Sequence, residues 1–144
     1  MNVLIDVNIV LDVLLDRQPG VADSKAVWDA NHRQEIRGHL VATALTNLFY
    51  IARRLVGHQR ARQGVRDCLA SFSVIAVHHQ ILIDADSQPG NDFEDNVCIS
   101  CAVSAGMEAI VTRDPAGFTH SPIPVLSPAQ LLAQLAQQQS RPNP

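Results

Sequence analysis

The sequence predicts an α/β domain with a short, mainly parallel sheet flanked by helices. Two observations support this prediction. Short apolar runs that suit buried strands alternate with longer segments in which apolar residues recur at helical spacing. Alternating elements of these lengths are typical of a parallel sheet with helices on both faces. A chain of 144 residues is also long enough for one domain with a full core.

In the first half of the chain, residues that favour turns or helix ends separate the expected elements. Pro19 and Gly20 belong to a turn, and Gly57 ends a helix. Thr43 or Thr46 is expected to cap that helix, because a threonine hydroxyl accepts hydrogen bonds from N–H groups of a first turn. The expected strands are 3–6, 38–42 and 73–77, and the expected helices are 8–16, 21–32, a segment ending at Gly57, and 58–70.

The second half continues the alternation. Helices are expected at 79–86 and 92–105, the second closed by Gly106, and a fourth strand at 109–111. A fifth strand at 122–126 contains prolines, so we expect it at a sheet edge. Pro128 suits the first position of a last helix. The domain is expected to span residues 2–136, followed by a polar tail at 137–144 that frays.

Composition excludes several classes of protein. Apolar residues make up 47% and charged residues 17%, as in ordinary soluble globular proteins. The apolar runs are too short to span a bilayer, and no cationic region precedes the first one as in a signal peptide. We therefore expect a cytoplasmic protein without a membrane segment. Cys68, Cys98 and Cys101 lie in helical patterns without zinc-type spacing, so we expect them in the core.

Charge is distributed unevenly along the chain. The net charge of −3 gives no overall attraction to nucleic acid. However, Arg53, Arg54, Arg60, Arg62 and Arg66 lie close together in sequence. Such a run either forms a solvated helix face or binds phosphate groups, which the planar guanidinium contacts well.

Four places along the chain offer carboxylates at strand ends or helix starts. Asp6 follows the first apolar run and Asp114 follows the fourth. In parallel α/β sheets, ligands bind at the carboxyl ends of the strands. The other two places are Asp12 and the run Asp92-Phe93-Glu94-Asp95, in which Asp92 and Asp95 share a helix face.

Each acid alone also has a structural interpretation. Asp6 would end a strand, Asp92 would cap a helix, and Asp114 would be a turn residue before Pro115. Together, clustered acids repel one another unless a cation neutralises them. Mg²⁺ and Mn²⁺ take carboxylate oxygens from several segments, and such a site can activate water and stabilise charge at a phosphorus centre.

The sequence lacks the patterns of the commoner alternatives. It contains no glycine-rich phosphate loop and no serine in a nucleophile-elbow pattern. The six histidines do not form a metal signature, and the pair His78-His79 is expected in a solvated loop or helix start.

Three motifs occur in a recognisable order. They are Leu4-Ile5-Asp6-Val7-Asn8 followed by Asp12, Asp92-Phe93-Glu94-Asp95 followed by Ala102, and Ile110-Val111-Thr112-Arg113-Asp114 followed by Phe118. In this order and spacing they resemble the PIN domain family, and in particular small prokaryotic PIN proteins such as the VapC-type toxins of toxin–antitoxin pairs. The resemblance extends over nearly the whole chain.

That resemblance implies a three-layer α/β/α fold and a metal-dependent endoribonuclease. In such an enzyme, acids hold Mg²⁺ or Mn²⁺, and a water activated by the metal attacks the RNA phosphodiester. It also implies RNA as substrate, an antitoxin protein as partner, and a homodimer. Carried over to this chain, the metal ligands are Asp6, Asp95 and Asp114, and the supporting residues are Asn8 and Thr112. RNA contacts are expected from Arg53, Arg54 and Arg60.

One position departs from the family pattern. Many members carry a glutamate on the helix after the second strand, where this chain has Asn47. Asparagine offers a carbonyl oxygen but no charge, so a weaker metal site is expected. Asp92 is a candidate replacement for the missing carboxylate and thus a fourth catalytic acid.

Three functions remain open at this point. The first is a metal-dependent ribonuclease of the toxin class. The second, suggested by Asn47, is a catalytically weak or inactive PIN-like protein that binds RNA or a protein partner. The third is a phosphotransferase with Asp6 as nucleophile, which ranks lowest because no second acid follows two residues later, as in haloacid-dehalogenase-type enzymes.

Overall fold

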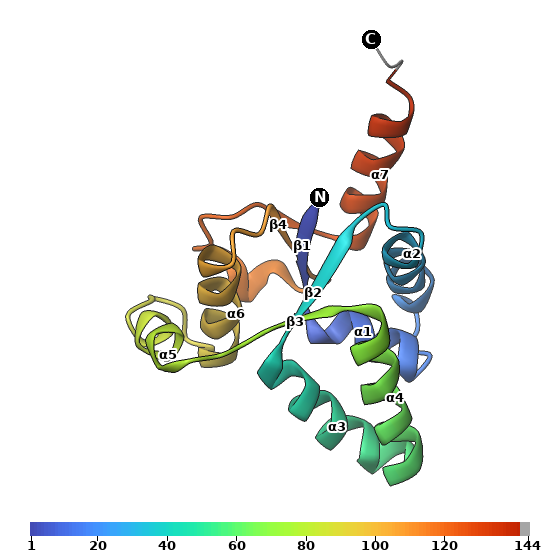
Figure 1. Cartoon of the computed structure of the whole chain (residues 1–144), viewed down its shortest axis with the longest axis horizontal. Helices are drawn as coiled ribbons and strands as arrows, with labels where there is room; N and C mark the ends of the chain where they lie inside the picture. The colour runs from blue at the N-terminus through green and yellow to red at the C-terminus, as the bar shows by residue number, and fades with distance from the viewer. Residues whose placement is uncertain (142–144) are drawn as a thin grey trace.

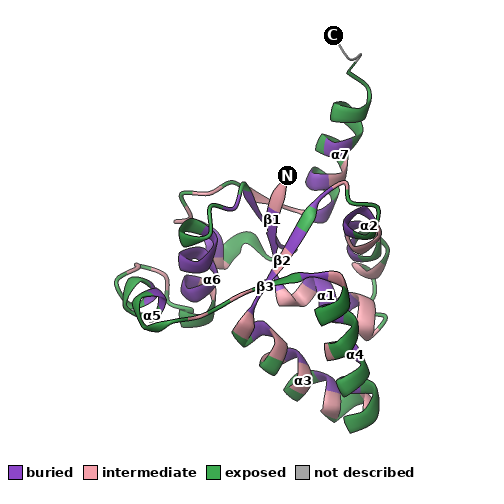
Figure 2. Ribbon diagram, in the orientation of Figure 1, coloured by how far each residue is buried: buried purple, intermediate pink, exposed green. Residues whose placement is uncertain are grey.

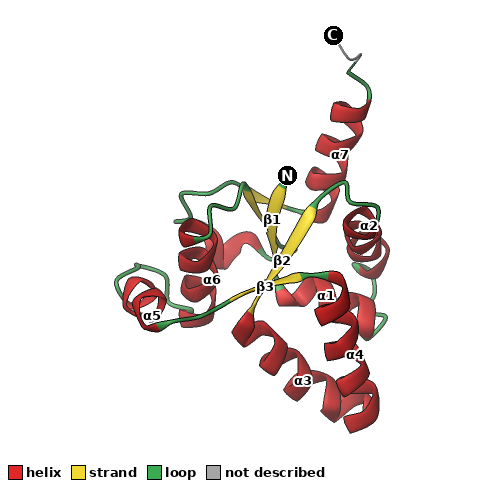
Figure 3. Ribbon diagram, in the orientation of Figure 1, coloured by secondary structure: helices red, strands yellow, loops and turns green. Residues whose placement is uncertain are grey.

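Five parallel strands form one sheet at the centre of the molecule (Figures 1 and 3). The structure is a computed structural model that describes residues 1–141. β1, which Asp6 follows, lies in the middle, and the strand order is β3-β2-β1-β4-β5. The strands are β1 Asn2–Ile5, β2 Arg37–Val41, β3 Ser73–Ile75, β4 Ala109–Val111 and β5 Val125–Leu126. The parallel sheet is confirmed, with β5 at an edge as expected.

Helices cover both faces of this sheet, which confirms the three-layer α/β/α fold. In Figure 1, α5 and α6 lie on one side of the sheet and α2 and α7 on the other. The hairpin of α3 and α4 extends beyond the carboxyl ends of the strands. The bounds are α1 Val7–Leu14, α2 Val21–His32, α3 Ala42–Val56, α4 His58–Ser71, α5 His79–Asp86, α6 Phe93–Ser104, the 3-10 helix η1 Pro115–Phe118, and α7 Pro128–Gln139.

The central strand is buried on both faces because its side chains alternate between two cores. Val3 and Ile5 pack with α1, α2 and α7, whereas Leu4 packs with residues of α5 and α6. None of the three is more than 1% exposed. Figure 2 shows this buried centre with exposed helix surfaces around it. Burial on both faces explains why the strands appear in the sequence as continuous apolar runs.

Several element boundaries differ from the sequence-based expectations. The expected threonine cap is wrong: α3 starts at Ala42, directly after β2, and the residue before it is Val41. The Thr46 hydroxyl instead donates to the carbonyl of Thr43 within the helix. β3 and β5 are shorter than expected. Their pairing with β2 and β4 covers only the residues 73–75 and 125–126, and only paired backbone is strand.

The last helix begins as expected and ends later. The Ser127 hydroxyl accepts from the N–H of Gln130, and the Gln130 side chain accepts from the N–H of Ser127, which completes a capping box. The helix continues to Gln139, into the stretch where a fraying tail was expected. Residues 142–144 of that stretch lie outside the described residues.

The three cysteines are free and buried, which confirms the expectation for them. Burial raises the pKa of the Cys68 thiol to about 12 and that of Cys101 to about 11. Thiols with such pKa values stay protonated and unreactive near neutral pH. Among the described helices, none combines the length and apolar character needed to cross a membrane.

Packing of α7 against the sheet generates a stability prediction. Leu131 is fully buried, whereas its neighbour Leu132 is only half-buried. We expect Leu131→Ala to lower the free energy of unfolding by about 2–5 kcal/mol, because the substitution leaves a cavity. Leu132→Ala removes the same atoms and should cost clearly less. Urea unfolding followed by circular dichroism measures both, and equal costs would contradict this packing.

Candidate functional site

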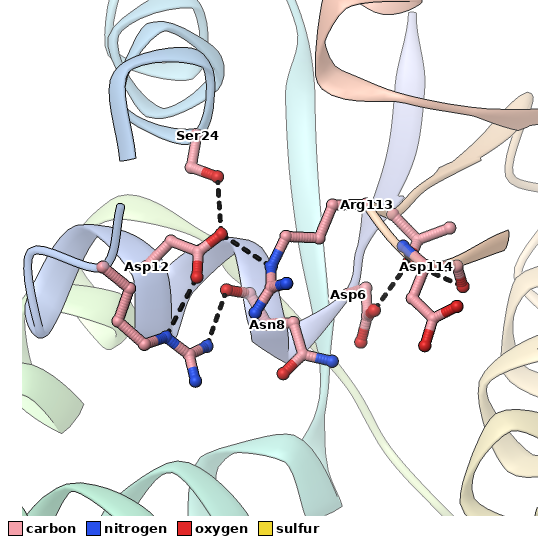
Figure 4. A network of polar contacts seen from close by, with 8 residues as sticks. Asp6, Asn8, Asp12, Ser24, Arg113 and Asp114 are labelled. Carbon is pink, nitrogen blue, oxygen red and sulfur yellow. Dashed lines mark hydrogen bonds and ion pairs between the residues drawn. The ribbon is translucent and has the colours of Figure 1, made fainter. Parts of the chain in front are cut away.

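The candidate site lies where the strand order of the sheet changes direction. From β1, the chain adds β2 and β3 on one side and β4 and β5 on the other. In parallel α/β sheets, the crevice outside the strand ends at such a switch point binds ligands. Asp6 follows β1, and Thr112 and Asp114 follow β4, so these residues lie together at this point. Figure 4 shows Asp6 and Asp114 there.

Asp6 is held at the bottom of the site. Asp6 is only 7% exposed. The buried Thr112 hydroxyl donates a hydrogen bond to Asp6 Oδ2 over 2.7 Å. Burial raises the pKa of Asp6, while the Thr112 hydroxyl, the Asn8 amide and the N–H groups at the start of α1 partly offset this. The Asp6 carboxylate is therefore oriented by its neighbours but costly to ionise without a cation.

Asp95 faces Asp6 from the first turn of α6. Its pKa is raised to about 6, first by burial and then by the charges of Asp92, Asp6, Glu94 and Asp114. The acids after β1 and β4 and those at the start of α6 are therefore close enough for their charges to affect Asp95. The backbone of η1 packs closely here, because a Cβ atom at Gly117 would overlap the Asp95 carboxylate. Gly117 is thus a site residue that the sequence motifs did not reveal.

Asp92 and Asn47 both make structural contacts at the edge of this acidic group. Asp92 Oδ1 accepts from the Asp95 N–H over 3.2 Å, so Asp92 is the N-cap of α6. Asn47 on α3 donates through Nδ2 to Glu94 Oε1 over 2.6 Å. At the position where many family members carry a glutamate, this chain therefore presents an asparagine bonded to a glutamate of another helix.

The acids affect a neighbouring thiol as well. Cys98 lies on α6, one turn beyond Glu94. Its pKa is raised mainly by burial, with further contributions from the charges of Asp6, Glu94 and Asp95. The thiol below the acids is therefore neutral and adds no charge to the site.

Asp12 is part of the same motif as Asp6 but has different neighbours. Its side chain is 2% exposed and forms ion pairs with Nε of Arg17 at 3.0 Å and Nε of Arg113 at 2.7 Å. Ser24 donates to the same carboxylate over 3.2 Å. In Figure 4, Arg113 extends from the end of β4 across to Asp12 on α1. The sequence placed Arg113 between two site residues without suggesting a partner for it.

The three arginines expected to contact RNA lie on the α3–α4 hairpin. Arg53 lies 4.9 Å above the ring of Tyr50, while Arg54 and Arg60 are exposed. In residues 1–141, no hydrogen bond or ion pair connects them to the acids. Their role in RNA binding stays a prediction.

The donor chemistry of the site fits a hard divalent cation. Carboxylates from three segments, after β1, at the start of α6 and after β4, lie near enough for the charges of Asp6 and Asp114 to add to the effect of burial and raise the pKa of Asp95. Within the described part of the chain, no three acidic, histidine or cysteine side chains already converge tightly enough to hold a metal. Mg²⁺ does not need such convergence, because one or two carboxylates and several waters commonly bind it.

Comparisons with known proteins agree with this fold. The PIN domain model matches residues 2–116, so the chain belongs to the PIN domain family. No curated protein sequence matches the chain significantly.

Solved structures with the same fold include several toxin–antitoxin proteins. A toxin–antitoxin complex from Klebsiella pneumoniae matches with a TM-score of 0.66 at 20% identity, over 88% of this chain and 97% of that one. DNA-bound VapBC from Salmonella typhimurium matches with a TM-score of 0.68 at 17% identity, over 89% of this chain and 98% of that one. VapC20 from Mycobacterium tuberculosis, a sarcin–ricin loop cleaving toxin, matches with a TM-score of 0.67 at 12% identity, over 81% of this chain and 92% of that one. At these identities the similarity establishes the fold alone.

The raised pKa of Asp95 generates a pH prediction. Because it lies at about 6 instead of the ordinary 3.8, the folded protein binds more protons than the unfolded chain between these values. The contribution of Asp95 to stability is therefore full below pH 4 and is lost as the pH rises through 6. In chelator, Asp95→Asn should be more stable than the wild type at pH 7 but not at pH 3.5.

Thermal unfolding across this pH range measures the effect. Asp86→Asn, which changes an exposed acid on α5, is the matched control and should show no such difference. An Asp95→Asn variant that is less stable than the wild type at pH 7 would contradict the proposed crowding of negative charge.

Proposed function

We propose that this protein is a metal-dependent endoribonuclease that acts as the toxin of a toxin–antitoxin pair. The observation that carries the proposal is that Asp6 and Asp114 follow neighbouring strands at the switch point of the sheet, and that burial, together with their charges, raises the pKa of Asp95. Membership of the PIN domain family and the fold shared with the toxin–antitoxin structures support it.

In this proposal, Asp6, Asp95 and Asp114 hold Mg²⁺ or Mn²⁺. When bound, the cation supplies charge stabilisation at the phosphorus centre and an activated water. Thr112 and Asn8 orient Asp6, the first by its hydroxyl bond and the second by its amide. Asp92 fixes the first turn of α6 and with it the position of Asp95.

A cleavage assay with matched variants tests this function. We expect the purified protein to cut RNA in Mg²⁺ or Mn²⁺ and to lose the activity in chelator. Asp6→Asn and Asp114→Asn should abolish cleavage, whereas the exposed Asp86→Asn should not change it. Thr112→Val keeps the shape but removes the oriented hydroxyl, and should lower kcat/KM by about 10- to 100-fold. Cleavage that persists in chelator would refute the proposal.

The contact between Asn47 and Glu94 favours a second candidate function. If Glu94, held by Asn47, does not replace the missing glutamate, the protein is a catalytically weak or inactive member that binds RNA or a protein partner. Retained RNA binding together with no Mn²⁺ affinity by calorimetry would select this alternative.

The structure allows the charge of Asp92 to be separated from its capping role. Asparagine caps helices about as well as aspartate, so Asp92→Asn removes only the charge. Asp92→Ala removes the cap as well, which costs about 1 kcal/mol of stability. If Asp92 replaces the missing carboxylate, Asp92→Asn should weaken Mn²⁺ binding without loss of stability.

Glu94→Gln is the matched comparison, because its amide oxygen can still accept the bond from Asn47. We expect this variant to weaken Mn²⁺ binding less than Asp92→Asn does. If Mn²⁺ affinity and cleavage are unchanged in Asp92→Ala, the replacement of the missing carboxylate by Asp92 is refuted.

The proposed partner is an antitoxin protein. Structures that share this fold include the toxin–antitoxin complex from Klebsiella pneumoniae and DNA-bound VapBC. A short reading frame beside the gene that encodes a DNA-binding protein would support this part of the proposal. Light scattering tests the expected homodimer.

A further inference from the structure

The group formed by Asp12, Arg17 and Arg113 sits beside the acids and carries a surplus positive charge. One carboxylate pairs with two guanidinium groups, so the group has a net charge of +1. Asp12 is nearly inaccessible, with a side-chain exposure of 2%, whereas Arg17 and Arg113 are 33% and 42% exposed. The anchor is therefore buried while both cations reach the surface.

The arginines keep free donors after pairing with Asp12. Each ion pair uses the Nε atom, which lies at the base of the guanidinium fork. One terminal nitrogen of Arg17 also donates to the Asn8 carbonyl over 3.3 Å. Throughout residues 1–141, the terminal nitrogens of Arg113 form no hydrogen bond. A guanidinium held in this way presents its planar outer edge, which matches two oxygens of a phosphate group.

The position of this group relative to the acids fits an extended backbone. Arg113 stands between Thr112 and Asp114, so it is attached directly to the site. Asp12 follows Asp6 by six residues along α1, which corresponds to about 9 Å at the helical rise. The arginines thus lie beside the acids without joining them, where an RNA strand bound at the acids through a cation would place a neighbouring phosphate.

We propose that Asp12 is a positioning residue that holds Arg17 and Arg113 as a clamp for an RNA phosphate next to the scissile one. This inference rests on the proposed ribonuclease function and assigns a substrate contact to it. A site built of acids alone repels RNA, and phosphate contacts from arginine supply both affinity and register. Among the described residues, no ion pair to a buried acid anchors the arginines of the α3–α4 hairpin.

Gly20 gives independent support for a fixed arrangement. A Cβ atom at this position would lie 2.9 Å from Asp12 Oδ2 and 3.6 Å from Cδ of Arg113. The backbone at the start of α2 therefore closes directly over the ion pair. Gly20→Ala crowds the clamp without changing any charge.

RNA binding without catalysis provides the test. The parent is the Asp6→Asn variant in chelator, and its affinity for a single-stranded RNA oligonucleotide is measured by fluorescence anisotropy at several salt concentrations. We expect Arg113→Gln and Arg17→Gln each to weaken binding by about tenfold. Each should also lower the salt slope by about 0.7, the value for one phosphate contact on a single strand. Arg113→Lys should restore the slope.

Arg33→Gln is the matched control. Arg33 pairs with Glu35 before β2, at the opposite end of the strands. Its removal should leave the affinity and the slope unchanged. Equal effects of Arg33→Gln and Arg113→Gln, or no RNA binding by the parent, would overturn the clamp.

The Asp12→Asn variant shows whether Asp12 acts by positioning the arginines or only through its negative charge. Removing a negative charge should tighten RNA binding if only net charge matters, and should weaken it if Asp12 positions the arginines. If Asp12→Asn does not fold, Gly20→Ala tests the positioning role instead, because it should weaken RNA binding without changing the charge. Tighter binding by Asp12→Asn, or unchanged binding by Gly20→Ala, refutes the positioning role.

The clamp and the ribonuclease function can fail separately. A protein that cleaves RNA in Mn²⁺, but whose Arg113→Gln variant binds RNA as the parent does, refutes only the clamp. A protein that binds RNA through Arg113 but never cleaves it refutes only the nuclease.

Discussion

The hydrogen bond from the Thr112 hydroxyl to the Asp6 carboxylate joins the ends of β1 and β4, and the site depends on it. β1 and β4 are paired neighbours in the sheet, and the strand order reverses between them. The sheet is buried on both faces, so the carboxylate at its central strand end has little water around it. A charge in that place is tolerated when hydroxyl, amide and cation partners surround it.

Asp6 and Asp12, two buried aspartates of one motif, have opposite electrostatic environments. Asp12 is neutralised by two arginines and a serine hydroxyl, all within the protein. Within residues 1–141, Asp6 receives hydrogen bonds but no cationic side chain, and the charges of further acids raise the pKa of Asp95. The unbalanced negative charge therefore lies at the ends of β1 and β4 and at the start of α6, while the group of Asp12 and its two arginines carries a net positive charge. Asp6 is the N-cap of α1, and Asp12 lies within the same short helix.

Much of the fold was predictable from the sequence, because strands buried on both faces leave uninterrupted apolar runs such as Val3–Ile5. The start of α3 was not, because β2 ends at Val41, one residue before the expected strand end, and α3 begins at once at Ala42, which places Thr43 inside its first turn. The acids were predictable as strand-end and helix-start residues. The Asp12–Arg113 and Asn47–Glu94 contacts were not, since each joins residues distant in sequence and no local pattern specifies their pairing.

Gly117 has a consequence for how variation in such proteins is interpreted. Its backbone lies against the Asp95 carboxylate, so the space for that acid is set by a residue that has no functional group. A search for functional positions that weighs only acids, bases and nucleophiles would pass over it. Any side chain at this position would displace Asp95 while every acid remained in the sequence. An intact set of acidic residues is thus insufficient evidence that a chain of this fold retains its site.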